Sequence, residues 1–88
     1  MARIEIYTTP FCPYCARAKA LLKRRKLPFE EIDVFMDATR RSEMTRRAKG
    51  RYTVPQIFVD GVGIGGSDEL DALEAEGRLA DMLADGPA

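Results

Sequence analysis

The amino-acid sequence predicts an α/β fold in which a four-stranded mixed sheet is flanked by three or four helices. Strand-like and helical patterns follow one another in the order β-α-β-α-β-β-α. Alternation of the first three strands with helices is typical of β-α-β units, and Asp60-Gly61 between two short apolar runs is typical of a hairpin turn. An 88-residue chain suits one such domain, which we expect over residues 1–84, with a short frayed tail at residues 85–88.

The first half of the chain supplies two strands and two helices. They are expected at residues 4–8 (strand), 13–26 (helix), 29–34 (strand) and from about residue 37 to 49 (helix). Pro13 suits the first position of a helix, and apolar residues follow it at helical spacing. Asp37 or Thr39 can cap the second helix. Since Met44 and Ala48 are its only good apolar anchors, we expect this helix to be the least stable.

The second half of the chain supplies a hairpin and a final helical region. Its strands are expected at residues 56–59 and 62–64, on either side of Asp60-Gly61. Ser67 is the predicted cap of the last helix, because Asp68 and Glu69 in the first turn suit the positive end of the helix dipole. We expect Gly77 to split this helix in two.

The composition excludes several classes of protein. Because the chain has no histidine, it can hold no Cys/His dyad, no Ser/His/Asp triad and no histidine-based zinc site. Its apolar runs are too short to cross a membrane, and charged residues interrupt the N-terminal stretch where a secretory signal would be apolar. We therefore expect a cytoplasmic protein, with neither membranes nor nucleic acids among its partners.

Charge is divided unevenly along a chain whose net charge is zero. Residues 1–51 hold 13 of the 14 basic and 6 of the 14 acidic residues, a balance of +7, and residues 52–88 carry the opposite balance. One explanation is a positive field around the cysteines, which favours thiolate and attracts anionic substrates. The other is two sets of solvated helix faces of opposite sign. The sequence leaves both open.

The two cysteines, Cys12 and Cys15, are three positions apart. A disulfide between them closes so small a loop that it stabilises the fold little, so reactivity is the better explanation of the pair. Structural zinc normally needs four ligands, and the chain has no second cysteine pair. A lone CxxC between a strand and a helix in a β-α-β context indicates thiol–disulfide chemistry.

Position on the chain predicts different roles for the two thiols. Cys12 falls at the mouth of the first helix, where unpaired N–H groups and the helix dipole favour thiolate, so we expect it to be the attacking nucleophile. Cys15 lies one turn further in, and we expect it to be more buried and to resolve a mixed disulfide formed at Cys12. Tyr14 offers an aromatic surface beside the sulfur.

Three motifs carry a resemblance to a known family. Cys12-Pro13-Tyr14-Cys15 matches the active site of dithiol glutaredoxins, and Thr53-Val54-Pro55 and Gly65-Gly66-Ser67-Asp68 fall where that family has its TVP and GG-[CS]-[DS] motifs. The chain resembles the family from Ile4 to Leu83, and its short bacterial members most of all. The resemblance implies a thioredoxin-like fold and a glutathione-dependent oxidoreductase that reduces protein disulfides and glutathione mixed disulfides.

The resemblance also implies a set of glutathione-binding residues. Pro55 corresponds to a cis-proline, and Val54 before it would pair through its backbone with the cysteinyl part of glutathione. At the start of the last helical region, backbone N–H groups would bind the γ-glutamyl carboxylate and Asp68 the ammonium. The implied set is Tyr14, Thr53, Val54, Pro55, Gly66, Ser67 and Asp68.

One position departs from the family pattern. Thr9 stands where many members carry a lysine that can contact the glycyl carboxylate of glutathione. Arg40 or Arg41, near the start of the second helix, can supply the missing charge.

The resemblance further implies a monomer with no bound cofactor or metal and with glutathione as co-substrate. Its protein partners would be disulfide or glutathionylated proteins, with ribonucleotide reductase-type substrates among the candidates. Two alternatives stay open: a redoxin reduced by thioredoxin reductase, and an iron–sulfur cluster carrier that shares its cluster through Cys12 and glutathione. Pro13 argues against the carrier, since cluster-holding members tend to have a smaller or more flexible residue there.

Overall fold

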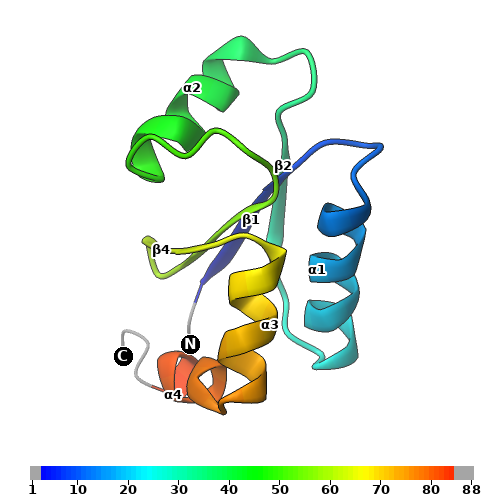
Figure 1. Ribbon diagram of the computed structural model, residues 1–88, viewed down its shortest axis with the longest axis vertical. Helices are drawn as coiled ribbons and strands as arrows, with labels where there is room; N and C mark the ends of the chain where they lie inside the picture. The colour runs from blue at the N-terminus through cyan, green and yellow to red at the C-terminus, as the bar shows by residue number, and fades with distance from the viewer. Residues whose placement is uncertain (1–2, 85–88) are drawn as a thin grey trace.

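A computed structural model describes residues 3–84 and confirms the predicted order of elements in this part of the chain. Its strands are β1 (Ile4–Thr8), β2 (Glu30–Asp33), β3 (Gln56–Val59) and β4 (Val62–Gly65). Its helices are α1 (Pro13–Arg24), α2 (Ala38–Arg47), α3 (Ser67–Ala75) and α4 (Arg78–Ala84). Figure 1 shows α2 on one side of the sheet and α1, α3 and α4 on the other.

The sheet is mixed, as predicted, with the strand order β2-β1-β3-β4. β1 pairs with β2 in parallel and with β3 in antiparallel, and β3 and β4 form the hairpin. At the turn, Asp60 and Gly61 both have positive φ angles, 51° and 82°, the conformation that two-residue hairpins favour. Because β1 is an interior strand, the loop that follows it places Cys12 beyond the C-terminal end of β1, near the middle of the sheet.

Alternating side chains of the central strands separate two core layers. Ile4 and Ile6 of β1 pack with α1, α3 and α4, whereas Tyr7 packs with Met44 under α2. Every residue of β1 is buried, because helices cover both faces of the sheet at this strand. This rigid strand supports the loop that carries the first cysteine.

α2 is attached to the sheet mainly by polar contacts. Met44 is its one buried residue. Arg47 forms two hydrogen bonds with the Glu5 carboxylate, at 2.9 and 3.3 Å, and donates to the Tyr7 hydroxyl at 2.7 Å. Its guanidinium also lies over the Phe58 ring, 4.2 Å from the centroid. Thus a charged side chain supplies much of the anchoring that the apolar pattern lacks.

Several predicted boundaries need correction. α1 and α2 end two residues early, at Arg24 and Arg47, because Lys26 and Lys49 have left-handed φ angles of 56° and 57°. The helix after the hairpin, α3, is capped by Gly66 and not by Ser67, which is its first residue. β2 is shorter than predicted, and β4 is one residue longer.

Other boundaries are confirmed. Asp37, and not Thr39, caps α2, since its carboxylate accepts from the Arg40 N–H at 3.0 Å. Gly77, with a φ of 73°, separates α3 from α4. The predicted frayed tail at residues 85–88 lies outside the described residues. Between residues 3 and 84, no helix has both the length and the apolar character needed to cross a membrane.

Candidate active site and adjoining groove

Cys12 is the N-cap of α1, the position that the sequence predicts. Its backbone is extended (φ −113°, ψ 109°), and Pro13 follows as the first helical residue. The Sγ atom accepts a hydrogen bond from the Cys15 N–H at 3.1 Å. A donor aimed at the sulfur, together with the helix dipole, favours negative charge there. The half-buried thiol is therefore suited to react as a nucleophile.

Cys15 lies inside the first turn and is buried, with 1% of its surface exposed. Burial, and then the hydrogen bond and charge of Cys12, raise the pKa of the Cys15 thiol to about 12. Both cysteines are free thiols in this structure. Cys15 is thus more buried than Cys12, as the sequence predicts.

The loop between α2 and β3 lies against the active-site turn. Its Val54–Pro55 peptide bond is cis, as the family resemblance implies. The Cys12 thiol lies 3.8 Å from the Val54 carbonyl oxygen, to which it donates a hydrogen bond. A backbone edge from a segment about forty residues away therefore borders the nucleophile.

Beside this edge lies a groove of about 290 Å³. Three segments of the chain form it: the first turn of α1, the α2–β3 loop and the start of α3. All seven predicted glutathione-binding residues line it. They are Tyr14, Thr53, Val54, Pro55, Gly66, Ser67 and Asp68.

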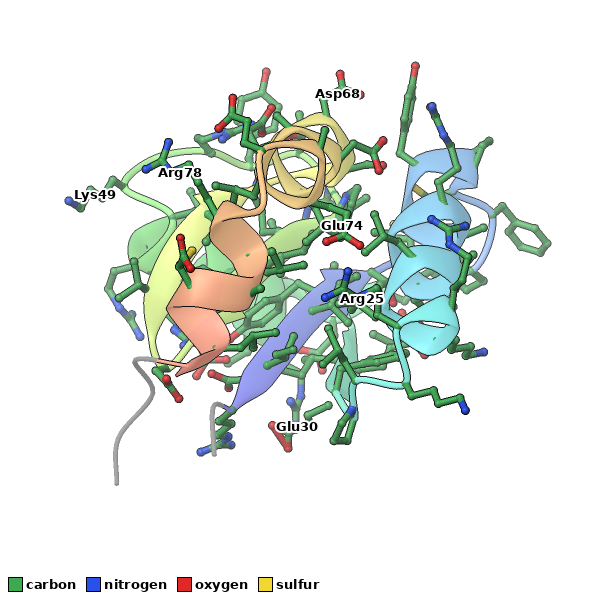
Figure 2. The ribbon with its side chains drawn as sticks, turned by 90° about the horizontal axis from the view of Figure 1, so that it is seen from below. Arg25, Glu30, Lys49, Asp68, Glu74 and Arg78 are labelled. Atoms are coloured by element: carbon green, nitrogen blue, oxygen red, sulfur yellow. The ribbon has the colours of Figure 1, made fainter. Side chains whose placement is uncertain are left out.

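Ser67 contributes a polar atom without a partner to this groove. Its hydroxyl oxygen is buried and forms no hydrogen bond with any residue that the structure describes. A buried, unpaired hydroxyl costs free energy, on the order of 1–3 kcal/mol, unless a ligand or water satisfies it. Asp68 beside it is exposed and points outward from the start of α3 in Figure 2. The helix start thus offers hydrogen-bond donors and the exposed Asp68 carboxylate.

Glycine permits the close approach of α3 to the loop. A Cβ atom on Gly66 would lie 3.2 Å from the Pro55 carbonyl oxygen, and one on Gly65 would collide with the Glu69 side chain. Gly65 also has a positive φ of 105°, which disfavours any other residue. The lack of a side chain at Gly66 therefore lets the start of α3 lie against the Pro55 carbonyl that borders the groove.

Two further residues of the groove, Arg51 and Glu69, were missed by the sequence-based prediction. The Glu69 carboxylate accepts from the Gly66 N–H at 2.7 Å and from the Arg51 guanidinium at 2.9 Å. These two bonds, the backbone one first, lower the pKa of Glu69. Glu69 lies three residues after the cap, a spacing that predicts such a bond. Arg51 has no comparable signal in the sequence.

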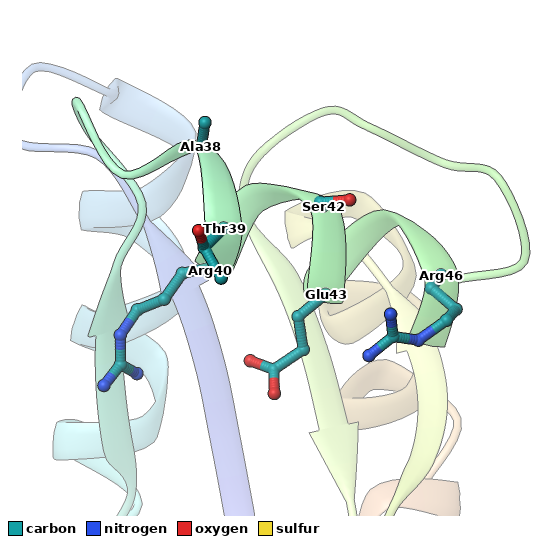
Figure 3. Close-up of a pocket in the computed structure, with 6 residues that line it drawn as sticks. All are labelled: Ala38, Thr39, Arg40, Ser42, Glu43 and Arg46. Carbon is teal, nitrogen blue, oxygen red and sulfur yellow. The ribbon is translucent and has the colours of Figure 1, made fainter.

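The two candidate arginines of α2 differ in position. Arg41 donates to the Tyr52 carbonyl oxygen at 3.1 Å, so its guanidinium lies at the loop that carries Thr53 and Val54. Arg40 instead forms an ion pair with Asp37, at 3.6 Å. It lines a hollow of about 650 Å³ on α2, which Figure 3 shows. That hollow is larger than the groove but contains neither cysteine.

The structure shows that some of the basic residues do not contribute to a positive field around the cysteines. The basic residues at positions 23–26 lie at the C-terminal end of α1, the opposite end from the cysteines. Arg25 pairs with Glu74 of α3 at 2.8 Å, and Figure 2 shows the two side chains meeting between these helices. A positive field around Cys12 therefore cannot include this run. Among the described residues, no group of three or more Cys, Asp or Glu is arranged to hold a metal ion.

The chain is similar to several known glutaredoxins. The family model described as Glutaredoxin matches residues 4–64. Glutaredoxin 3 of Escherichia coli (strain K12) is 52% identical over 83 residues, covering 94% of this chain and 99% of that protein. A glutaredoxin of Pseudomonas aeruginosa is 45% identical over 84 residues, covering 96% and 99%. Among solved structures, the glutaredoxin from Brucella melitensis has a TM-score of 0.85 at 51% identity and covers 100% of this chain and 95% of that one.

Proposed function

The chain belongs to the glutaredoxin family of thiol–disulfide oxidoreductases and has its thioredoxin-like fold, and on this premise we propose that glutathione is its co-substrate. In this proposal, the Cys12/Cys15 dithiol reduces protein disulfides and glutathione mixed disulfides. The observation that carries it is the groove beside Cys12, which combines a backbone edge, a helix start and the unpaired Ser67 hydroxyl.

Glutathione is a tripeptide with a carboxylate and an ammonium at its γ-glutamyl end. The N–H groups at the start of α3 suit that carboxylate, which would also give the buried Ser67 hydroxyl an acceptor that no residue in the described part of the chain provides. The exposed Asp68 carboxylate suits the ammonium. The cysteinyl backbone then pairs with Val54 in an extended conformation, with its sulfur directed to Cys12.

For the glycyl carboxylate we propose Arg41. Its guanidinium already lies at the Tyr52 carbonyl, next to the Thr53 end of the groove, and Thr9 cannot supply a charge. Arg41→Gln is expected to raise the KM for glutathione about tenfold, the usual effect of losing a charge-assisted hydrogen bond. Arg40→Gln removes the same charge one residue earlier and serves as the control, with a change of no more than about twofold. Equal effects of the two substitutions would exclude this assignment.

The reaction proceeds by thiolate attack at both stages. In the monothiol route, Cys12 attacks the glutathione sulfur of a protein mixed disulfide, and the protein thiolate leaves. A second glutathione thiolate then attacks the glutathione bound to Cys12, which releases oxidised glutathione and restores the Cys12 thiolate.

In the dithiol route, Cys12 forms a mixed disulfide with one sulfur of a protein disulfide. Cys15 then attacks Cys12, the protein thiolate leaves, and two glutathiones reduce the resulting Cys12–Cys15 disulfide. Neither route requires a metal or an organic prosthetic group, and both suit a monomer in the reducing cytoplasm.

A coupled assay with glutathione, glutathione reductase and a glutathionylated peptide tests the proposal. Wild type and Cys15→Ser are expected to turn over, whereas Cys12→Ser loses activity by at least about a thousandfold, because no nucleophile remains at the helix mouth. If Cys12→Ser stayed active and Cys15→Ser did not, the two roles would be reversed.

The two alternatives give different results. A redoxin reduced by thioredoxin reductase would show no turnover with glutathione but would turn over with that reductase. An iron–sulfur carrier purified without oxygen would show visible absorption bands, and their absence would exclude it.

A further inference from the structure

A polar cluster lies behind the resolving cysteine. The Lys19 ammonium is 2.9 Å from the Glu31 carboxylate, and the Thr8 hydroxyl donates to the same carboxylate oxygen at 2.8 Å. Thr8 is the last residue of β1 and is buried, with 2% of its surface exposed. Three elements, α1, β1 and β2, therefore contribute to one hydrogen-bonded group.

Strand alternation shows which layer this cluster occupies. Thr8 shares the face of β1 with Ile4 and Ile6, which pack against α1. Glu31 lies on the opposite face of β2 from Ile32, which packs in the α2 layer. The cluster thus lies between the sheet and α1, whose buried residues include Cys15.

Lys19 follows Cys15 by four residues on α1. Side chains at this spacing share one helix face, with Cβ atoms roughly 5–6 Å apart. The Lys19 side chain is 29% exposed, since the Glu31 carboxylate, to which Thr8 also donates, holds its ammonium beside the sheet. An ion pair this accessible adds little to stability, so stability explains the arrangement poorly.

Cys15 needs a nearby positive charge for a chemical reason. Only the thiolate attacks a disulfide, and burial keeps this thiol protonated by raising its pKa to about 12. A backbone hydrogen bond with Thr9, and after it the charge of Lys19, act on the pKa of this thiol in the opposite direction. A cation at this position therefore favours the species that the second step of the dithiol route consumes.

We propose that Lys19, held by the Glu31 carboxylate, assists the resolving step by stabilising the Cys15 thiolate as it attacks the mixed disulfide at Cys12. The inference rests on the dithiol route proposed above. In the step, the Cys15–Cys12 bond forms and the bond from Cys12 to the substrate sulfur breaks. Cys15 is oxidised, the substrate sulfur is reduced, and the Cys15 proton, released to water, is matched by protonation of the leaving thiolate.

The titratable groups facing the Cys15 thiol are Cys12 and Lys19 of its own helix, with Glu31 of β2 behind Lys19. The loop that packs against Cys12 presents the uncharged residues 53–55. Across the groove, the start of α3 adds the carboxylates at positions 68 and 69. Arg51 also lines the groove, where it is paired with Glu69 at 2.9 Å. Lys19 is the cation that acts on the Cys15 thiol.

Reaction of the reduced protein with a chromogenic aromatic disulfide separates the two steps. Cys12 attacks first and releases one aromatic thiolate, and Cys15 then releases the second, so stopped-flow absorbance gives both rates without glutathione. At neutral pH, Lys19→Gln is expected to slow the second release about fivefold and the first by less than about twofold. Its second-phase pH profile should shift upward, and the rates of variant and wild type should converge at high pH.

Two controls separate charge from structure. Lys19→Arg keeps the charge and is expected to retain the wild-type second phase, and Lys23→Gln removes a charge one turn further along α1 without changing either phase. Unchanged second-phase kinetics in Lys19→Gln, an equal slowing of both phases, or loss of the second phase in Lys19→Arg would each overturn the proposal. A normal second phase in a protein that fails the glutathione assay would instead reject the proposed co-substrate alone.

Discussion

Replacement of Arg47 tests how α2 is attached to the sheet. Arg47→Met keeps most of the apolar stem but removes both hydrogen bonds to Glu5, the one to Tyr7 and the stacking on Phe58. The Glu5 side chain is only 12% exposed, so its carboxylate loses its partner in a poorly solvated position. The substitution should therefore destabilise the whole fold and not α2 alone.

The magnitude follows from the exposure of the pair. Exposed ion pairs contribute up to about 1 kcal/mol, and breaking a fully buried one costs about 3–5 kcal/mol. With the Arg47 side chain 27% exposed, an intermediate value of about 2 kcal/mol is appropriate for Glu5. Loss of the cation–π contact, whose centroid distance is 4.2 Å, adds about 1 kcal/mol. We expect a total loss of about 3 kcal/mol, a large share of the stability of a domain of this size.

Urea unfolding followed by circular dichroism measures this loss, with Arg46→Met as the control at an exposed neighbour. The Arg47 hydrogen bond holds the pKa of Glu5 below its ordinary value, although burial opposes it. A lowered folded-state pKa contributes stability above the unfolded-state pKa, and this stability disappears as the pH falls through the folded-state value. The difference between Arg47→Met and wild type should therefore shrink in acid. A loss below about 1 kcal/mol, or one independent of pH, would refute this explanation.

Two further substitutions test the groove. In Gly65→Ala, a new Cβ would have a positive φ and would also collide with Glu69, whereas the Cβ of Gly77→Ala has a positive φ but meets nothing within 4 Å. Gly65→Ala should therefore lower the free energy of unfolding in urea by roughly 1–2 kcal/mol more than Gly77→Ala does. Equal losses would mean that only the backbone conformation matters. Ser67→Ala removes the unpaired hydroxyl, so stability should stay the same or rise while the KM for glutathione increases about fivefold. A lower stability of Ser67→Ala would show that this hydroxyl has a partner in the free protein.

Local signals in the sequence predicted most of the fold because they act within a few residues. Alternation located the strands, Asp60-Gly61 located the hairpin, and Gly77 located the break between α3 and α4. Helix ends were predicted less well. The charged run after Leu22 continues the helical pattern, but Lys26 adopts a left-handed conformation that returns the chain toward β2. Since lysine has no special preference for the left-handed conformation, this helix end could not be predicted from the residue type.

Most residues that line the groove could be predicted from the sequence, but the ion-paired residues around the active site could not. Cys12 and Ser67 belong to short motifs whose residue types match their chemistry. Arg51 and Lys19 are ordinary surface residues in the sequence, and their importance comes from partners 18 and 12 positions away. An ion pair between distant segments produces no periodic pattern in the sequence, so only the structure shows which basic residues form ion pairs.

The attachment of α2 links stability to binding. One buried residue, Met44, gives this helix too little apolar contact to define its position on the sheet. Arg47 fixes its C-terminal end against β1, and Arg41, nearly two turns earlier, bonds to the carbonyl of Tyr52. That carbonyl precedes the cis peptide segment whose Val54 borders Cys12. Because directional bonds replace apolar packing at both contacts, a shift of α2 would move the backbone edge beside the nucleophile, and substitutions under α2 should therefore affect glutathione binding as well as unfolding.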